Sequence, residues 1–158
     1  MNHSRLRLTL AAVSIAACLH VSAHEVTRTA GVPVAGEVPA RSYIRAVLLA
    51  GKLRSPRELN AMTAEDQRNA LIVELAGRTN QPVAHFQALD DAALAGAGAL
   101  LVFLRETRIR GDRELKVMGE DELRGAVIAA LGPRFMHDPK MRHLDNMDLV
   151  RMALGIAP

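Results

Sequence analysis

Two stretches decide the fold: RSPRELNAMTAEDQRNALIVELAGR at residues 54–78 and RGDRELKVMGEDELRGAVIAALGPR at residues 110–134. Aligned at a shift of 56 without a gap, they are identical at ten of 25 positions. A second match follows at a shift of 55, between LDDAAL at residues 89–94 and LDNMDL at residues 144–149. Such self-similarity is typical of chains built from repeated supersecondary units. The sequence therefore predicts an internal duplication, with halves at about residues 42–97 and 98–154.

Helix-start signals stand at matching places in the two halves. Thr63 is a natural N-cap followed by two acidic residues, and Gly119 precedes a similar acidic run in the second stretch. Asp90 and Asp145 stand at the predicted starts of two further helices. Carboxylates in the first turn face the positive end of the helix dipole, so a helix start explains each acidic cluster. Glycines at 77 and 132 are predicted to end the preceding helices.

The segment AALAGAGALLVFL at residues 92–104 is apolar on every side. It is too short to span a bilayer, so we expect it to be the central helix of the fold. Gly96 and Gly98 each cost the helix about 1 kcal/mol, which indicates a close crossing with another helix. The predicted fold is an all-α, internally duplicated bundle of about eight short helices in two pseudo-equivalent halves, forming a single domain at residues 41–158.

The first 23 residues have the pattern of an export signal. Arg5 and Arg7 precede an apolar run at residues 8–21, and small residues then allow cleavage before His24. Residues 24–40 contain two glycines and two prolines and are predicted to form a flexible leader. The expected location is therefore periplasmic or secreted.

Cys18 leaves an alternative open. Residues 15–18, Ile-Ala-Ala-Cys, resemble a bacterial lipobox, in which residues 1–17 are removed and the cysteine is lipidated. The protein would then be a membrane-anchored lipoprotein, and contact with a membrane is expected only through this possible anchor. Because Cys18 is the single cysteine, residues 41–158 contain no thiol under either cleavage.

The charge balance gives little support to nucleic-acid binding. The whole chain has 20 basic and 17 acidic residues, a net charge of +3. Removal of the signal takes away Arg5 and Arg7 and leaves 18 against 17, or +1. A nucleic-acid partner is therefore not expected.

Residues suited to catalysis are scarce. The serines after residue 23, Ser42 and Ser55, do not stand in a Gly-x-Ser-x-Gly setting, and no phosphate-binding glycine-rich loop is present. No cofactor is expected. The alternative is a small metal-dependent or other enzyme using residues 137–148, where His137, His143 and Asp145 would be the metal ligands.

Basic residues cluster around the inter-helix turn of each half. They are Lys52, Arg54 and Arg57 in the first half and Arg108, Arg110 and Arg113 in the second. They suit either of two roles, complementing helix C-termini or binding an anionic partner.

The polar loop at residues 79–82 has no counterpart in the second half, and it places Asn80 and Gln81 among the candidate binding residues. Duplicated helical units commonly form binding surfaces. The sequence thus predicts an exported, non-enzymatic helical interaction protein of the envelope or extracellular space, with a protein or an anionic envelope component as its partner.

Overall fold

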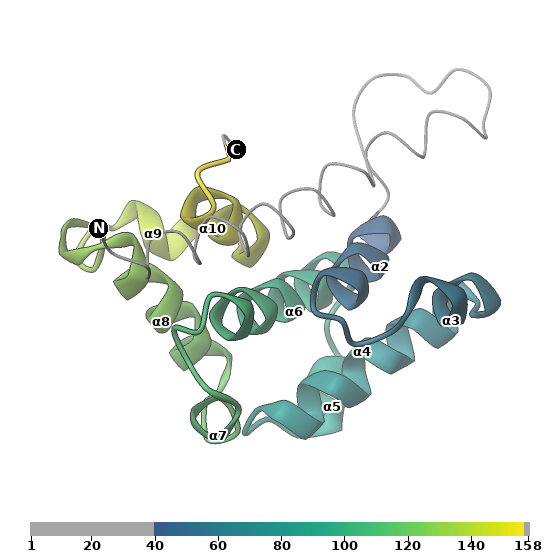
Figure 1. Cartoon of the computed structure of the whole chain (residues 1–158). Helices are drawn as coiled ribbons and strands as arrows, with labels where there is room; N and C mark the ends of the chain where they lie inside the picture. Colours follow the sequence, from purple (N-terminus) through teal and green to yellow (C-terminus); the bar gives the residue numbers. More distant parts are fainter. Residues whose placement is uncertain (1–39, 157–158) are drawn as a thin grey trace, which may run out of the picture.

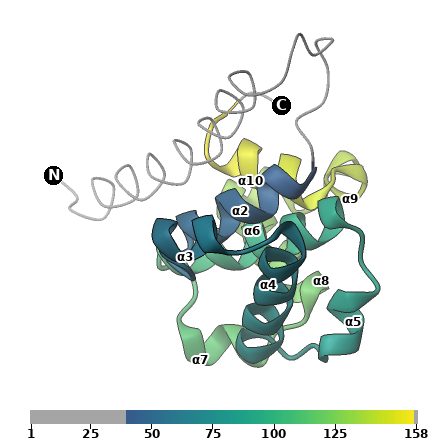
Figure 2. The same cartoon turned by 90° about the vertical axis from the view of Figure 1, so that its right-hand side faces the viewer.

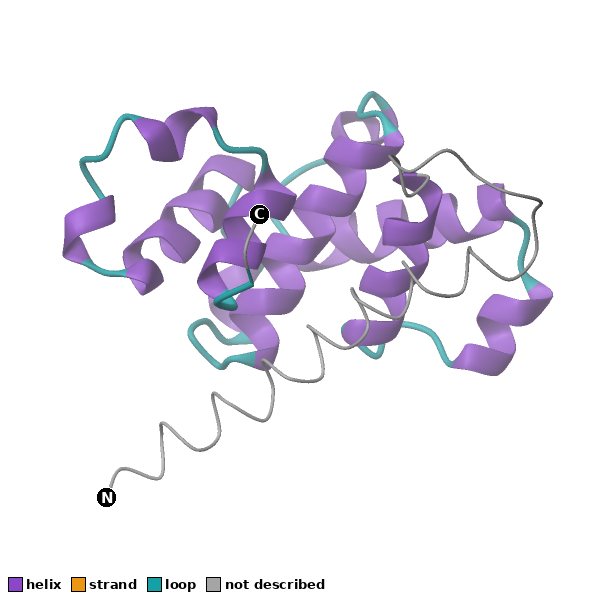
Figure 3. Cartoon of the chain, turned by 90° about the horizontal axis from the view of Figure 1, so that it is seen from above, coloured by secondary structure: helices purple, strands orange, loops and turns teal. Residues whose placement is uncertain are grey.

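The computed structural model describes residues 40–156, and within them the chain is helical, with no strand (Figure 3). Nine α-helices and one short 3-10 helix follow one another, so the predicted all-α class is confirmed for this range. The elements are α2 (Ala40–Ala50), α3 (Pro56–Ala61), α4 (Ala64–Arg78), α5 (Val83–Gln87), α6 (Asp91–Glu106), α7 (Asp112–Leu115), α8 (Glu120–Leu131), η2 (Pro133–Phe135), α9 (Lys140–His143) and α10 (Asn146–Ala153). The predicted signal and nearly all of the predicted leader lie outside the described residues.

Helix α6 is the centre of the domain, as its apolar composition predicts. In Figure 1 it lies between α8 and α2, with α10 above it and α4 below. It packs against all four of these helices, and every residue from Leu94 to Leu104 is buried. None of the helices in residues 40–156 combines the length and apolar character needed to cross a bilayer.

The two glycines of α6 mark close helix crossings, which confirms the prediction made from their cost in helix propensity. A Cβ atom on Gly98 would lie 2.8 Å from Cγ1 of Val47 in α2 and 3.1 Å from Cδ1 of Leu71 in α4. A Cβ atom on Gly96 would lie 2.9 Å from Cβ of Asn146 in α10. The absence of a side chain at these positions therefore lets three helices approach α6 closely.

Helix α4 begins with the predicted N-cap. The Thr63 hydroxyl accepts a hydrogen bond from the Asp66 amide, and the Asp66 carboxylate accepts one from the Thr63 amide, which forms a capping box. Gly119 takes the same position before α8, where its amide donates to the Glu122 carboxylate. The side chains of Asp90 and Asp145 cap α6 and α10 as predicted.

One predicted helix end is displaced. Gly132 has a φ of +119° and ends α8 as expected. Gly77, in contrast, lies inside α4, which continues to Arg78. Thr79 follows with an extended backbone, and its buried hydroxyl donates to the Leu75 carbonyl 2.8 Å away. The chain therefore leaves the helix at a threonine whose own side chain satisfies one of the last carbonyls.

The turns after α2 and α6 have the same geometry. Lys52 and Arg108, 56 residues apart, are the two non-glycine residues with positive φ in the described range, at 52° and 59°. In each turn the carbonyl four residues earlier, on Leu48 or Leu104, accepts hydrogen bonds from the two amides that follow the positive-φ residue. Both helices thus end in a left-handed turn that satisfies their terminal carbonyls.

A second matched pair consists of arginines that tie one helix to the start of another. Arg68 of α4 donates to the Asp91 carboxylate at 2.5 Å and to the backbone carbonyl two residues before Asp91. Arg124 of α8 makes the same two bonds with Asn146, at 2.7 Å, and the carbonyl two residues before it. Figure 2 shows α4 running between the short helices α3 and α5. The arginine thus holds the loop after α5 to α4, and its counterpart does the same for the loop after α9 and α8.

Candidate functional site

The two predicted basic turns lie beside each other. The Lys52 ammonium is 3.6 Å from the Glu106 carboxylate at the end of α6. Arg105, also at the end of α6, donates a hydrogen bond to the Gly51 carbonyl at the end of α2. The C-terminal ends of α2 and α6 therefore meet, and Lys52 and Arg108 stand on adjacent turns.

Arg54 from the first basic turn is held inside the fold. Its guanidinium donates to the Glu74 carboxylate at 2.7 Å, and Arg78 donates to the other oxygen of Glu74 at 2.9 Å. Burial acts to raise the pKa of Glu74, but the hydrogen bonds from Arg54 and Arg78 outweigh it and leave that pKa lowered. Glu74 is thus a shared anion between two arginines, and Arg54 has a clear structural role.

The other predicted basic residues are more exposed. Arg57 lies exposed on α3, and Arg108 is exposed in its turn. Arg110 is 3.9 Å from Glu114, an ion pair at the limit of useful contact on a surface. Arg113 is exposed on α7 and lines a groove.

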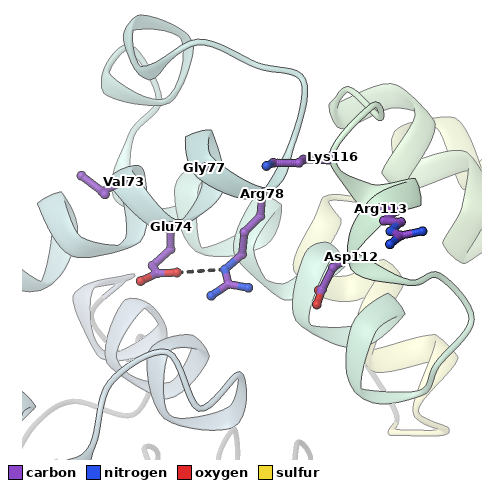
Figure 4. A pocket seen from close by; sticks show the side chains of 7 residues that line it. All are labelled: Val73, Glu74, Gly77, Arg78, Asp112, Arg113 and Lys116. Carbon is purple, nitrogen blue, oxygen red and sulfur yellow. Dashed lines mark hydrogen bonds and ion pairs between the residues drawn. The ribbon is translucent and has the colours of Figure 1, made fainter.

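This groove lies between the C-terminal half of α4 and α7, and its volume is about 420 Å³. Figure 4 shows the side chains that line it, which come from these two helices and the residue just after α7. They are Val73, Glu74, Gly77, Arg78, Asp112, Arg113 and Lys116. In Figure 4 Lys116 points from the α7 side toward α4, whereas Arg113 points away from α4 in the same view. The lining therefore combines an apolar surface with several charged groups.

The α7 side of the groove carries one carboxylate, Asp112, and two cations, Arg113 and Lys116. Arg78 shares the charge of Glu74, but within residues 40–156 neither Arg113 nor Lys116 lies within 4.0 Å of a carboxylate. Val73, on the α4 side of the same groove, is 60% exposed and adds apolar surface to the lining. The arrangement suits a ligand that offers both negative charge and apolar surface.

The predicted binding loop at residues 79–82 fixes the shape of the groove. The backbone amide of Asn80 donates to the Met118 carbonyl at 2.9 Å, which joins the chain after α4 to the chain after α7. The Gln81 side-chain amide packs over Gly119, since a Cβ atom built on Gly119 would lie 2.9 Å from Nε2 of Gln81. Asn80 and Gln81 thus have a packing role beside the groove, and a ligand contact by either residue stays a prediction.

The predicted metal ligands are not brought into a common site. His137 and His143 are both exposed, and one oxygen of Asp145 accepts a hydrogen bond from the Asp148 amide at 2.7 Å as the cap of α10. Among the described residues, no three His, Cys, Asp or Glu side chains are placed so that they could hold a metal ion.

Several groove residues could not be identified as a site from the sequence. Arg78 belongs to the repeated positions and Lys116 follows Arg113 by three residues, but Val73, Glu74 and Gly77 carry no motif. Their grouping depends on α4 and α7 meeting across the fold. Comparison of the chain with protein-family models, with curated proteins and with solved structures gives no match.

Proposed function

We propose that the chain is an exported, non-enzymatic helical binding protein that holds an acidic segment of a partner protein in the groove between α4 and α7. The observation that carries this proposal is the pair of cations on the α7 side, Arg113 and Lys116, beside the exposed Val73. These two cations outnumber the one carboxylate on the same side of the groove, Asp112, and an excess of one charge around an apolar contact favours a partner of opposite charge. A protein segment is favoured over a polymer of charge alone because the groove also offers apolar surface.

Gly77 supports a close approach of the partner. A glycine inside a helix costs about 1 kcal/mol relative to alanine. At Gly98 the packing of neighbouring helices explains this cost, but no atom of the described residues lies within 4 Å of a Cβ atom built on Gly77. Gly77 lines the groove. The missing side chain leaves room on the α4 surface for the backbone or side chains of another molecule.

The groove also fits the proposed duplication. The matched turns at Lys52 and Arg108, and the matched bonds of Arg68 and Arg124, support two halves with a common origin. Helix α4 belongs to the first half and α7 to the second. The groove is therefore a product of the pairing of the halves.

Site-specific photo-crosslinking in producing cells tests the groove. A photoreactive residue at Val73 is expected to form an adduct with a protein of the envelope fraction. The control is the same residue at Val83, which is 43% exposed on α5 and outside the groove. The double variant Arg113→Glu/Lys116→Glu is expected to abolish the Val73 adduct. Equal adducts at Val73 and Val83, or an adduct that survives charge reversal, would contradict the proposed site.

A second variant separates binding from folding. Gly77→Leu adds a side chain where the fold has space, so the melting temperature is expected to stay the same or rise. The same variant fills the groove and is expected to remove the crosslink. Retained crosslinking in a folded Gly77→Leu protein would show that the partner does not use the groove.

Mass spectrometry of the mature N-terminus tests export. Cleavage before His24 gives a chain that begins at that residue, and the alternative gives a chain that begins at a lipidated Cys18. Either result supports export. A chain that begins at His24 means that the binding domain is released, and a lipidated Cys18 means that it is anchored to a membrane. An intact N-terminus at Met1 in every cell fraction would refute the proposed export.

A further inference from the structure

A second cavity, separate from the α4–α7 groove, lies where the N-terminal ends of three helices meet. Its volume is about 510 Å³, and residues of α2, α6, α8 and α10 line it together with the caps of α6 and α10. This volume is in the range of typical small-molecule sites, roughly 300–1,000 Å³. The less polar residues of its lining include Tyr43, Ala93, Gly96 and Met147.

Arg124 brings a cation with spare hydrogen-bond donors to this cavity. Within residues 40–156 its guanidinium donates to the Asn146 side chain and to the carbonyls of Met141 and Leu144. An arginine side chain has five N–H donors, so two are left over. No carboxylate of the described residues lies within 4.0 Å of it, whereas its counterpart Arg68 is 2.5 Å from Asp91.

The replacement of Asp91 by Asn146 at the matched position is therefore a local loss of negative charge. The amide of Asn146 instead donates to the Glu120 carboxylate at 2.8 Å. The geometry of the arginine is kept, but its charge is no longer neutralised by the residue that it binds. This difference between the halves occurs in the lining of the cavity.

Carboxylates stand in the lining as well. One oxygen of Asp90 accepts from the Ala93 amide at 2.8 Å, and one oxygen of Asp145 accepts from the Asp148 amide at 2.7 Å. The second oxygen of each has no hydrogen bond within the described residues. The cavity therefore offers unused acceptors on Asp90 and Asp145 and unused donors on Arg124. Arg151 also lines it, and two of its five donors are taken by Asp148 and Tyr43.

We propose that this cavity binds a small zwitterion, either a free amino acid or a short peptide, and holds its ammonium and its carboxylate at the same time. The carboxylate of the ligand takes the free donors of Arg124, and its ammonium takes the free oxygens of Asp90 and Asp145. Its side chain lies against Tyr43 and Met147. A ligand with only one charge leaves the opposite charge in the cavity unpaired and binds more weakly. This inference does not depend on the partner proposed for the α4–α7 groove.

Calorimetric titration of the mature protein tests the site. The probes are glycine, L-alanine, L-leucine and L-alanyl-L-leucine, with N-acetyl-L-leucine and L-leucinamide as analogues that each lack one charge. At least one zwitterion is expected to bind, and removal of either charge is expected to weaken binding about tenfold or more, equivalent to about 1.4 kcal/mol. Binding by the dipeptide alone identifies a short peptide as the ligand, and binding by free amino acids identifies the smaller ligand.

Two variants assign the binding to the cavity. Asp90→Asn keeps an N-cap residue but removes the charge, so the helix is expected to form and the affinity for the zwitterion to fall about tenfold. Ala93→Phe fills the cavity and is expected to abolish binding, whereas Ala129→Phe, at an exposed position of α8 outside the lining, is expected to leave it unchanged. The proposal is overturned if no zwitterion binds at millimolar concentration. It is also overturned if the singly charged analogues bind equally well, or if folded Ala93→Phe protein retains binding.

Discussion

Gly98→Ala tests the close crossing of α2 and α4 with α6. The new Cβ atom would lie 2.8 Å from the Val47 side chain and 3.1 Å and 3.3 Å from the two terminal carbons of Leu71. All three residues are buried, so the contact cannot be relieved by turning a side chain into solvent. Either α2 or α4 has to move away from α6.

The expected magnitude follows from two opposing effects. Extra volume in a packed core costs about 1–3 kcal/mol, and replacing a helical glycine by alanine recovers up to about 1 kcal/mol. The net result for Gly98→Ala is a loss of about 1 kcal/mol in the free energy of unfolding. The matched control is Gly125→Ala in α8, where no atom of residues 40–156 lies within 4 Å of the added Cβ. That variant is expected to gain roughly 0.5–1 kcal/mol.

Urea denaturation followed by circular dichroism at 222 nm measures both variants on the mature chain. The two midpoints are expected to move in opposite directions from that of the parent protein. If Gly98→Ala is stabilised as much as Gly125→Ala, then α2 and α4 do not approach α6 as the structure shows, and the reasoning fails.

Three further predictions concern single side chains. Glu74→Gln is expected to cost roughly 1–3 kcal/mol at pH 7, because Arg54 and Arg78 lose a shared carboxylate. Since the pKa of Glu74 is lowered in the folded protein from its ordinary value of 4.5, its contribution is present above that value and is lost as the pH falls through the folded-state pKa. The stability difference from the parent protein should therefore close in acid, and urea titrations at pH 7 and at acid pH check this. Thr63→Ala removes a capping box and is expected to cost about 1 kcal/mol, while Thr63→Asn keeps a cap and should restore most of it, as thermal melts would show. Phe86→Ala empties a fully buried site and is expected to cost about 3–5 kcal/mol, and a loss below 1 kcal/mol in denaturant would contradict its burial.

Local features of the fold could be predicted from the sequence because their causes are local. Thr63, Asp90 and Asp145 cap helices through bonds to amides three residues away, so the pattern and the contact lie in the same short window. The all-apolar run around Gly96 and Gly98 likewise predicts a central helix, since no surface helix tolerates such a composition. Gly77 misled the prediction of a helix end because the end of α4 is set by Thr79 and the hydrogen bonds that follow it.

The candidate site could not be predicted because it depends on contacts between distant segments. Arg113 stands out in the sequence as part of a basic cluster, but its place in one groove with Gly77 depends on the pairing of α4 and α7, which the bond between the Asn80 backbone amide and the Met118 carbonyl supports. Arg54 belongs to the other cluster, and only the fold reveals that Glu74 engages it. Charge patterns identify groups that can bind an anion, but not which of them are already paired within the protein.

The burial of α6 has a consequence for how the domain unfolds under mechanical force. Because α2 and α4 cover one part of this helix and α8 and α10 cover the rest, neither α2 nor α10 can detach without exposing it. A fragment that stops at residue 106 would present an apolar helix face to water, with aggregation as the expected fate. The domain should consequently open in a single cooperative step when it is pulled from its ends, with no stable half-unfolded state.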